Sequence, residues 1–281
     1  MNRVRIMQGR LSPPMPDNPQ YFPTDRWQRE FALASELGFD TIEWLIDEAS
    51  HANNPMLSKE GRQRIRETVE ANGVHLMSVC ADYFKDHTLA DLNPFARSTR
   101  TALLIRLIEA AADLGIGCVL VPFLEGSTIR SPQAQRVAGD ALKEPLDIAA
   151  SAEVSIGVET DLPAEVLGSW VSEMDHPSLG VYYDLGNAVA SGFDPAQEII
   201  YLGTWLLGVH VKDRTFHGPN VPLGTGSVDF PACFRSIHNT GFRGPLVLET
   251  ARGGDYYGDA KRYLTFVTQH TNAVSQELSP R

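Results

Sequence analysis

The sequence predicts an α/β protein folded as a single (β/α)₈ barrel, the TIM barrel. Eight short apolar segments, rich in β-branched residues, alternate with eight helix-like segments. Glycine stands at several of the junctions where a helix would end and the next strand begin. The chain of 281 residues is long enough for one such barrel. A doubly wound open sheet is the alternative, but no G-x-G-x-x-G motif follows the first apolar segment.

The apolar and helix-like segments can be assigned in order. We expect strands at Val4–Gln8, Asp40–Trp44, Val74–Cys80, Cys118–Phe123, Ser155–Glu159, Gly180–Asp184, Leu206–Val211 and Leu246–Glu249. We expect helices at 25–37, 58–72, 95–114, 133–151, 163–174, 195–201, 229–240 and 255–272. The junction glycines are Gly38, Gly73, Gly115 and Gly241. Glycine tolerates the left-handed conformation that ends a helix, so these positions support a repeated βα unit.

No linker or low-complexity tract divides the chain, so residues 1–281 are expected to form one domain. A proline-rich loop, residues 9–24, follows the first expected strand. In a barrel it would lie on the catalytic face as a wall or lid, although an ordinary surface excursion fits equally well. Residues 276–281 are expected to be a short frayed tail.

Composition excludes several classes of protein. The net charge of −11 argues against nucleic acid and anionic membranes as partners. No run of eighteen apolar residues could span a bilayer, and the first residues run into a strand rather than a signal peptide. Three separated cysteines in apolar surroundings suit a reducing compartment. We therefore expect a cytoplasmic protein.

Four consecutive expected strands end in residues that could bind a metal. They are Glu159, Asp184, His210 and Glu249. The carboxyl ends of barrel strands converge on one face, so these four side chains should meet. Three clustered carboxylates would repel one another and take up protons unless a cation lay among them. A single acidic residue at a strand end would be weak evidence, but four in succession predict a site for one divalent ion.

The ligand types restrict the metal. Three oxygen ligands, one nitrogen and no thiolate favour Mn²⁺, with Co²⁺, Mg²⁺ and Zn²⁺ as alternatives.

Motifs toward the end of the chain carry a family resemblance. Gly208–Asp213 reads GVHVKD, Val221–Phe230 reads VPLGTGSVDF, and Gly244–Glu249 reads GPLVLE. With these motifs the chain resembles the xylose-isomerase-like barrel superfamily. It is most similar to the L-ribulose-5-phosphate 3-epimerase and ketose 3-epimerase branch. The resemblance spans nearly the whole chain.

That resemblance implies a metal-dependent epimerase or isomerase acting on a small ketose or ketose phosphate. Glu159, Asp184, His210 and Glu249 would be the metal ligands, and Glu159 and Glu249 would be the catalytic acid/base pair. A proton would be removed and returned through a metal-stabilised enediolate. The resemblance also implies a homodimer or homotetramer.

Three other functions remain open at this point. A dehydratase or lyase of the inosose dehydratase type would use the same metal and the same intermediate. An AP endonuclease is disfavoured by the acidic charge and by histidines that do not converge. A non-catalytic sugar-binding barrel is disfavoured by the complete set of four ligands.

Further polar residues near the strand ends are candidates for substrate binding. They are Gln8, Arg10, Glu43, Asn187, Lys212, His217 and Arg252. Glu43 could instead cap the loop that follows it. Asn187 stands where many relatives have a histidine, which leaves proton shuttling from the sixth strand in doubt.

The segment Gly224–Ser227 has two interpretations. It could be a nest of N–H groups for a substrate phosphate, or a turn before a helix capped by Ser227 or Asp229.

Overall fold

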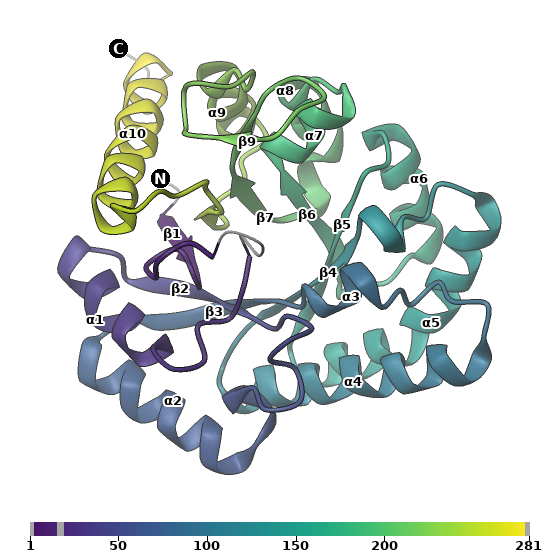
Figure 1. Cartoon of the computed structure of the whole chain (residues 1–281). Coiled ribbons are helices and arrows are strands. Elements are labelled where there is room, and N and C mark those ends of the chain that lie inside the picture. The colour runs from purple at the N-terminus through teal and green to yellow at the C-terminus, as the bar shows by residue number, and fades with distance from the viewer. Residues whose placement is uncertain (1–2, 16–19, 279–281) are drawn as a thin grey trace.

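A closed barrel of parallel strands, ringed by helices, forms the body of the molecule (Figure 1). The computed structural model describes residues 3–15 and 20–278. The barrel strands are β1 (Val4–Met7), β2 (Thr41–Leu45), β3 (His75–Cys80), β4 (Cys118–Phe123), β5 (Ser155–Thr160), β6 (Leu179–Asp184), β7 (Leu206–Val211) and β10 (Leu246–Leu248). They pair in the order β1-β10-β7-β6-β5-β4-β3-β2. The predicted (β/α)₈ barrel is confirmed.

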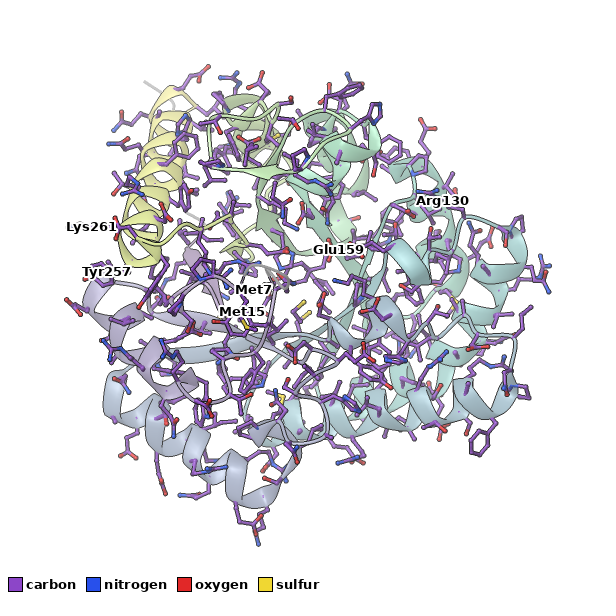
Figure 2. The ribbon with its side chains drawn as sticks, in the orientation of Figure 1. Met7, Met15, Arg130, Glu159, Tyr257 and Lys261 are labelled. Atoms are coloured by element: carbon purple, nitrogen blue, oxygen red, sulfur yellow. The ribbon has the colours of Figure 1, made fainter. Side chains whose placement is uncertain are left out.

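The outer ring consists of α1 (Trp27–Leu37), α2 (Lys59–Asn72), α4 (Pro94–Asp113), α5 (Pro132–Ser151), α6 (Ala164–Met174), α8 (Pro195–Leu202), α9 (Phe230–Asn239) and α10 (Tyr256–Glu277). Two shorter helices are α3 (Tyr83–Asp86), which begins shortly after β3, and α7 (Leu185–Ser191), which follows β6 directly. A two-stranded hairpin, β8 (Asp213–Arg214) and β9 (Asn220–Val221), follows β7. The sequence did not predict these small elements. Figure 2 shows Glu159 and Met7 near the middle of the ring, with Lys261 at its outer edge.

Helix boundaries follow from the local sequence. Asn93, Ser131 and Asp194 each stand directly before a proline that opens a helix, and each side chain accepts a hydrogen bond from a backbone N–H of the first turn. Proline lacks the N–H group that a first turn leaves unpaired, so this pairing of cap and proline fixes where a helix begins.

The four glycines predicted at helix ends all have positive φ. The angles are 89° at Gly38, 63° at Gly73, 70° at Gly115 and 76° at Gly241. The chain turns there into the next strand, as expected for a left-handed helix end.

The loop at residues 9–24 is described except for residues 16–19. Its last part is anchored by Phe22, whose ring lies 5.2 Å from that of Trp44. The prediction of a frayed tail at 276–281 falls partly on α10, which continues to Glu277, and partly on residues 279–281, which lie outside the described residues. In the described part of the chain, every helix is too short or too polar to cross a membrane.

Candidate active site

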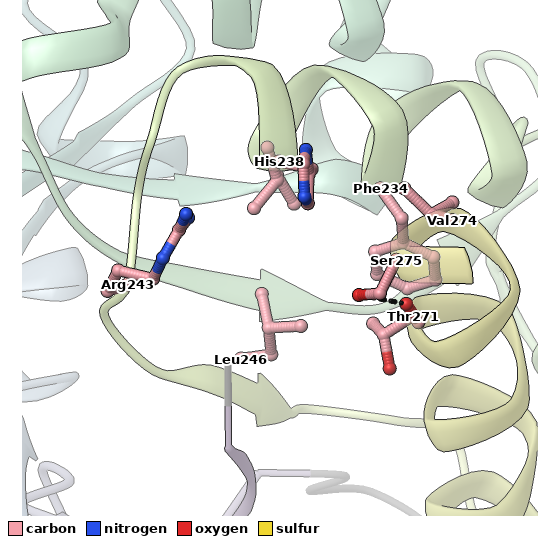
Figure 3. Close-up of a pocket in the computed structure, with 8 residues that line it drawn as sticks. Phe234, His238, Arg243, Leu246, Thr271, Val274 and Ser275 are labelled. Carbon is pink, nitrogen blue, oxygen red and sulfur yellow. Dashed lines mark hydrogen bonds between the residues drawn. The ribbon is translucent and has the colours of Figure 1, made fainter. Parts of the chain in front are cut away.

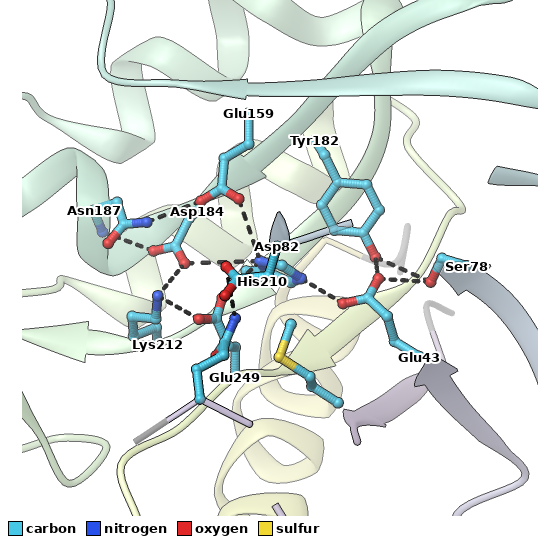
Figure 4. Close-up of polar contacts among 12 residues, drawn as sticks. Glu43, Ser78, Asp82, Glu159, Tyr182, Asp184, Asn187, His210, Lys212 and Glu249 are labelled. Carbon is cyan, nitrogen blue, oxygen red and sulfur yellow. Dashed lines mark hydrogen bonds and ion pairs between the residues drawn. The ribbon is translucent and has the colours of Figure 1, made fainter. Parts of the chain in front are cut away.

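The four predicted ligands all lie at the carboxyl ends of neighbouring strands (Figure 4). Glu159, Asp184 and His210 each place one ligand atom within 4.8 Å of the others. Glu249 follows β10, and its Oε2 lies 2.8 Å from Nδ1 of His210. All four side chains are buried. The structure therefore brings these four residues together.

The carboxylate oxygens and the imidazole nitrogen of the four ligands face one another, and each can bind a cation through a lone pair. Nδ1 of His210 lies 3.8 Å from Oδ2 of Asp184 and 4.0 Å from Oε2 of Glu159. Among the described residues, neither this Nδ1 nor this Oδ2 has a contact with hydrogen-bond geometry, although Nδ1 lies 2.8 Å from Oε2 of Glu249. Buried polar atoms without a hydrogen bond are costly, and three carboxylates around one imidazole form a donor set that a divalent cation satisfies. The residues therefore fit a metal ion.

Lys212 lies beside the same carboxylates. Its Nζ is 2.7 Å from Oε1 of Glu249 and 3.0 Å from Oδ2 of Asp184, although the latter contact lacks hydrogen-bond geometry. The ammonium group is buried, and its pKa is raised because the neighbouring carboxylates outweigh the cost of burial. Lys212 is therefore a fixed positive charge at the wall of the site.

The two glutamates experience opposite electrostatic environments. Burial raises the pKa of Glu159 to about 8, and the neighbouring Asp184 and Glu249 add to this rise. Burial would also raise the pKa of Glu249, but Lys212 and His210 together hold it well below the usual value. Two carboxyl groups with pKa values moved apart can act as an acid and a base at one pH.

Arg10 approaches Glu249 from the loop after β1, with Nη2 3.8 Å from Oε1. The backbone on either side of Arg10 is held by Glu30 of α1, which is almost fully buried. The carboxylate of Glu30 accepts hydrogen bonds from the N–H groups of Gly9, at 2.8 Å, and Leu11, at 3.1 Å. Helix α1 thus fixes the position of this loop at the site.

A cavity of about 220 Å³ is lined by two of the four ligands, Glu159 and Glu249. Its lining includes Arg10, Glu159, Asn187, Lys212 and Glu249. Nδ2 of Asn187 donates a hydrogen bond of 2.8 Å to Oε1 of Glu159. Of the residues predicted to contact substrate, Arg10, Asn187 and Lys212 therefore lie where a bound molecule could reach them.

The remaining predicted substrate contacts lie elsewhere among the described residues. Gln8 is buried and accepts the N–H of Leu45. His217 is exposed, and Arg252 donates to the carbonyl of Ser12. These residues do not line the cavity in the described part of the chain, and their roles in substrate binding stay predictions.

Glu43 lies behind His210 rather than at the cavity wall. Its Oε1 is 2.7 Å from Nε2 of the imidazole, the nitrogen that points away from the other ligands. Its Oε2 accepts hydrogen bonds of 2.6 Å from the hydroxyls of Ser78 and Tyr182. Both Glu43 and His210 are 1% exposed.

The cavity wall also contains residues that the sequence analysis missed, namely Gln20, Asp82, Lys85, Arg214 and Asn220. Asp82 stands two residues beyond β3, so the rule that found the other strand-end carboxylates could have found it. Gln20 lies in the loop after β1 and Asn220 in the short strand β9, and no sequence pattern marked either residue.

The glycine-rich segment after β9 binds a carboxylate of the protein itself. Asp213 accepts hydrogen bonds from the N–H groups of Gly224 and Gly226, both at 2.9 Å, and of Val228, at 3.3 Å. A side chain at Gly226 would overlap the Asp213 carboxylate. Asp229 then caps α9. The structure agrees with the interpretation as a turn before a helix capped by Asp229, whereas the N–H groups considered for a substrate phosphate bind Asp213.

A second, smaller cavity of about 70 Å³ lies at the opposite end of β10, between α9 and α10 (Figure 3). Leu246, the first residue of β10, forms part of its lining. It is remote from Glu249 and the strand-end carboxylates.

Comparison with known proteins places the chain in a family. A family model described as xylose isomerase-like TIM barrel matches residues 31–266. The chain is 30% identical over 236 residues to L-ribulose-5-phosphate 3-epimerase UlaE of Salmonella heidelberg (strain SL476), which covers 79% of this chain and 81% of that protein. The corresponding protein of Salmonella paratyphi A is 31% identical over 237 residues, with the same coverage.

Solved structures share the fold at lower identity. An L-ribulose 3-epimerase superposes with a TM-score of 0.79 at 17% identity, over 100% of this chain and 99% of that one. A xylose isomerase-like barrel protein from Mycobacterium smegmatis, solved in complex with magnesium, gives a TM-score of 0.73 at 17% identity over 97% of each chain. The curated relatives are named as epimerases, so the prediction of an enzyme is confirmed. The chain belongs to the xylose isomerase-like TIM barrel family.

Proposed function

We propose that this protein is a divalent-metal-dependent epimerase or isomerase of a small ketose or ketose phosphate. The observation that carries the proposal is the placement of Glu159 and Glu249. They extend from β5 and β10, which are separated in the barrel by β6 and β7, and they border one cavity. Epimerisation beside a carbonyl removes a proton from one face of a carbon and returns a proton to the other. Two carboxyl groups on separate strands suit that requirement.

Glu159, Asp184, His210 and Glu249 would hold the cation. Once bound, a divalent ion supplies a Lewis acid that stabilises negative charge on the substrate oxygens. Mn²⁺ remains our preferred ion, since the donor set of oxygens and one imidazole nitrogen suits it, and Mg²⁺, Co²⁺ and Zn²⁺ suit the same donors.

The protein's own residues move the protons. Glu249, whose pKa Lys212 and His210 hold low, is ionised at neutral pH and accepts the proton. Glu159 would return a proton to the opposite face through the carboxylate oxygen that does not bind the ion. Asn187 orients Glu159 through its 2.8 Å hydrogen bond. Positioned acid–base groups typically contribute about 10²–10⁴-fold in rate.

The cavity supports a sugar as the substrate. Its wall combines charged and amide side chains, including Arg214, Asp82 and Asn220, which can pair with several hydroxyl groups at once. The names of the curated relatives support a ketose phosphate, and the name of the solved L-ribulose 3-epimerase supports an unphosphorylated ketose. We therefore propose that the substrate is a ketose, and the experiment below tests whether it carries a phosphate group.

Proton exchange in D₂O tests the proposed reaction. The Mn²⁺-loaded enzyme is incubated with L-ribulose 5-phosphate and, separately, with L-ribulose, and the products are analysed by NMR. We expect deuterium at C3 of the substrate that is turned over. Label confined to C1 or C2 would contradict epimerisation in favour of aldose–ketose isomerisation, and loss of water would identify a dehydratase.

Two variants test the assigned residues. Glu249→Gln should lower turnover by roughly 10²-fold or more while the circular dichroism spectrum is retained. The exposed Glu173 of α6 provides the matched control Glu173→Gln, which should keep the wild-type rate. His210→Ala should lower the metal content found by elemental analysis, whereas His238→Ala, on α9, should not. Unchanged stoichiometry in His210→Ala would remove His210 from the ligand set.

A further inference from the structure

The imidazole of His210 is held between two sets of carboxylates. Nδ1 faces Glu159, Asp184 and Glu249, and Nε2 faces Glu43 alone among the described residues (Figure 4). An imidazole that binds a metal through one nitrogen must keep that nitrogen free of a proton. The tautomer of His210 therefore decides whether Nδ1 can act as a ligand.

The hydrogen bonds around Glu43 determine where the ring proton lies. Oε2 of Glu43 accepts hydrogen bonds from the hydroxyls of Ser78 and Tyr182, at 2.6 Å each. Oε1 then lies 2.7 Å from Nε2 of His210. With Oε2 engaged by two hydroxyl groups, Oε1 is the acceptor that faces Nε2, and we assign Nε2 as the protonated nitrogen. Nδ1 lies 2.8 Å from Oε2 of Glu249, so both ring nitrogens face a carboxylate. A cation at Nδ1 would replace a proton there, while Nε2 keeps its proton toward Glu43.

The barrel interior is shaped to hold this arrangement. The ring of Tyr182 packs over Gly208 of β7, where any side chain would overlap it, and against Gly157 of β5, where a methyl group would lie 3.3 Å from it. The same ring lies 4.8 Å from that of His210. Tyr182 can therefore reach Glu43 across the barrel because β7 carries glycine at position 208, and glycine at position 157 of β5 relieves a further close contact.

We propose that Glu43, held by Ser78 and Tyr182, is a positioning residue that fixes the tautomer of His210 and so presents Nδ1 to the metal. The proposal rests on the metal site of the proposed function. It differs from the sequence-based expectation that Glu43 contacts substrate. Groups that orient a metal-binding histidine in this way typically contribute about 10–100-fold to metal affinity.

The main test is the affinity for Mn²⁺ alone, with no substrate present, measured by competition with a chelator. Glu43→Gln should weaken Mn²⁺ binding roughly 10–100-fold, because the side chain loses its charge and no longer compels Nε2 to carry the proton. Tyr182→Phe and Ser78→Ala keep the carboxylate and should each weaken binding by a smaller factor. These two variants keep the proposal testable if Glu43→Gln does not fold.

Glu198→Gln is the matched control. Glu198 also accepts a hydrogen bond from a tyrosine hydroxyl, that of Tyr183 at 2.7 Å, but it lies on α8 outside the barrel. Urea unfolding of each EDTA-treated variant separates loss of stability from loss of metal affinity. A purely structural role for Glu43 predicts lower stability with unchanged affinity for Mn²⁺.

A second readout examines the tautomer directly. In Mg²⁺-loaded protein with ¹⁵N-labelled histidine rings, His210 should carry its proton on Nε2, and the resonance of that proton should move strongly in Glu43→Gln. A proton on Nδ1 in the wild type, or equal Mn²⁺ affinity in wild type and Glu43→Gln, overturns the inference and leaves the proposed function intact. A wild-type protein that binds no Mn²⁺ overturns both.

Discussion

Nζ of Lys212 lies 2.7 Å from Oε1 of Glu249, within the same buried site in which Oε2 of Glu249 approaches His210. One oxygen of the carboxylate therefore faces an ammonium group and the other faces the proposed metal position. This arrangement keeps Glu249 ionised, and it makes Lys212 the residue whose removal should most directly change the basicity of Glu249.

Lys212→Met should lower kcat/KM by about 10²-fold, since a preorganised and buried positive charge is lost from the site. Without the ammonium group the pKa of Glu249 rises, so the acidic limb of the pH–rate profile should move to higher pH. Steady-state kinetics across pH provide the measurement. Lys143→Met, which removes an exposed lysine paired only with Asp140 among the described residues, is the control. A near-normal rate in Lys212→Met would contradict the role.

Gly208→Ala should disturb the site from within the barrel. The added methyl group would overlap the ring of Tyr182, so the ring must move away from Glu43. We expect a loss of about 1–3 kcal/mol in the free energy of unfolding, together with weaker Mn²⁺ binding. Gly117→Ala is the matched control, because a methyl group there meets nothing within 4 Å. Equal stability of the two variants would show that the interior tolerates the overlap.

Asp213→Asn should loosen the segment between β9 and α9. The carboxylate accepts three backbone N–H groups, and an amide keeps only one acceptor oxygen for them. We expect destabilisation of about 1–3 kcal/mol and faster hydrogen exchange at Gly224 and Gly226. Hydrogen exchange followed by mass spectrometry measures this directly. Asp229→Asn, a change at the cap of α9, should leave the exchange of these two amides unaltered. Slow exchange of both amides in Asp213→Asn as well would show that Asp213 does not hold this segment.

Glu30→Gln should change how stability depends on pH. Burial raises the pKa of Glu30 to about 7, from an ordinary value near 4.5. The folded protein then holds a proton that the unfolded chain releases, so its stability relative to the variant is greatest below about pH 4.5 and falls as the pH rises through 7. The difference should change by about 2.5 kcal/mol between pH 5 and 8. Urea unfolding of both proteins at several pH values measures it, and a constant difference would contradict a raised pKa.

The sequence was sufficient for the architecture because each signal acted locally. β-Branched runs defined the strands, and glycine at positions such as Gly38 and Gly241 defined the helix ends. The convergence of Glu159 and His210 then followed from the parallel direction of the strands. Short elements such as α7 were missed because seven residues carry too little periodicity to be recognised.

Depth along a strand was the main quantity that the sequence did not supply. Glu43 was expected near the end of a strand at Asp40–Trp44, but β2 runs from Thr41 to Leu45 and places Glu43 in its middle. Its side chain therefore lies below the rim and meets His210 instead of the cavity. Nor could the sequence show that Asp213 would fill the glycine-rich nest, because that contact joins segments about a dozen residues apart through a hairpin.

The hydrogen bonds beneath His210 have a consequence for attempts to graft this catalytic centre onto another scaffold. Copying the four cation-binding residues alone would leave the imidazole free to adopt either protonation pattern and to rotate. A transplant that works must also bring the glutamate, the serine and the tyrosine from β2, β3 and β6, with two glycines to make room for the aromatic ring. The smallest set of residues to transfer thus includes side chains from the barrel interior as well as those at the ends of its strands.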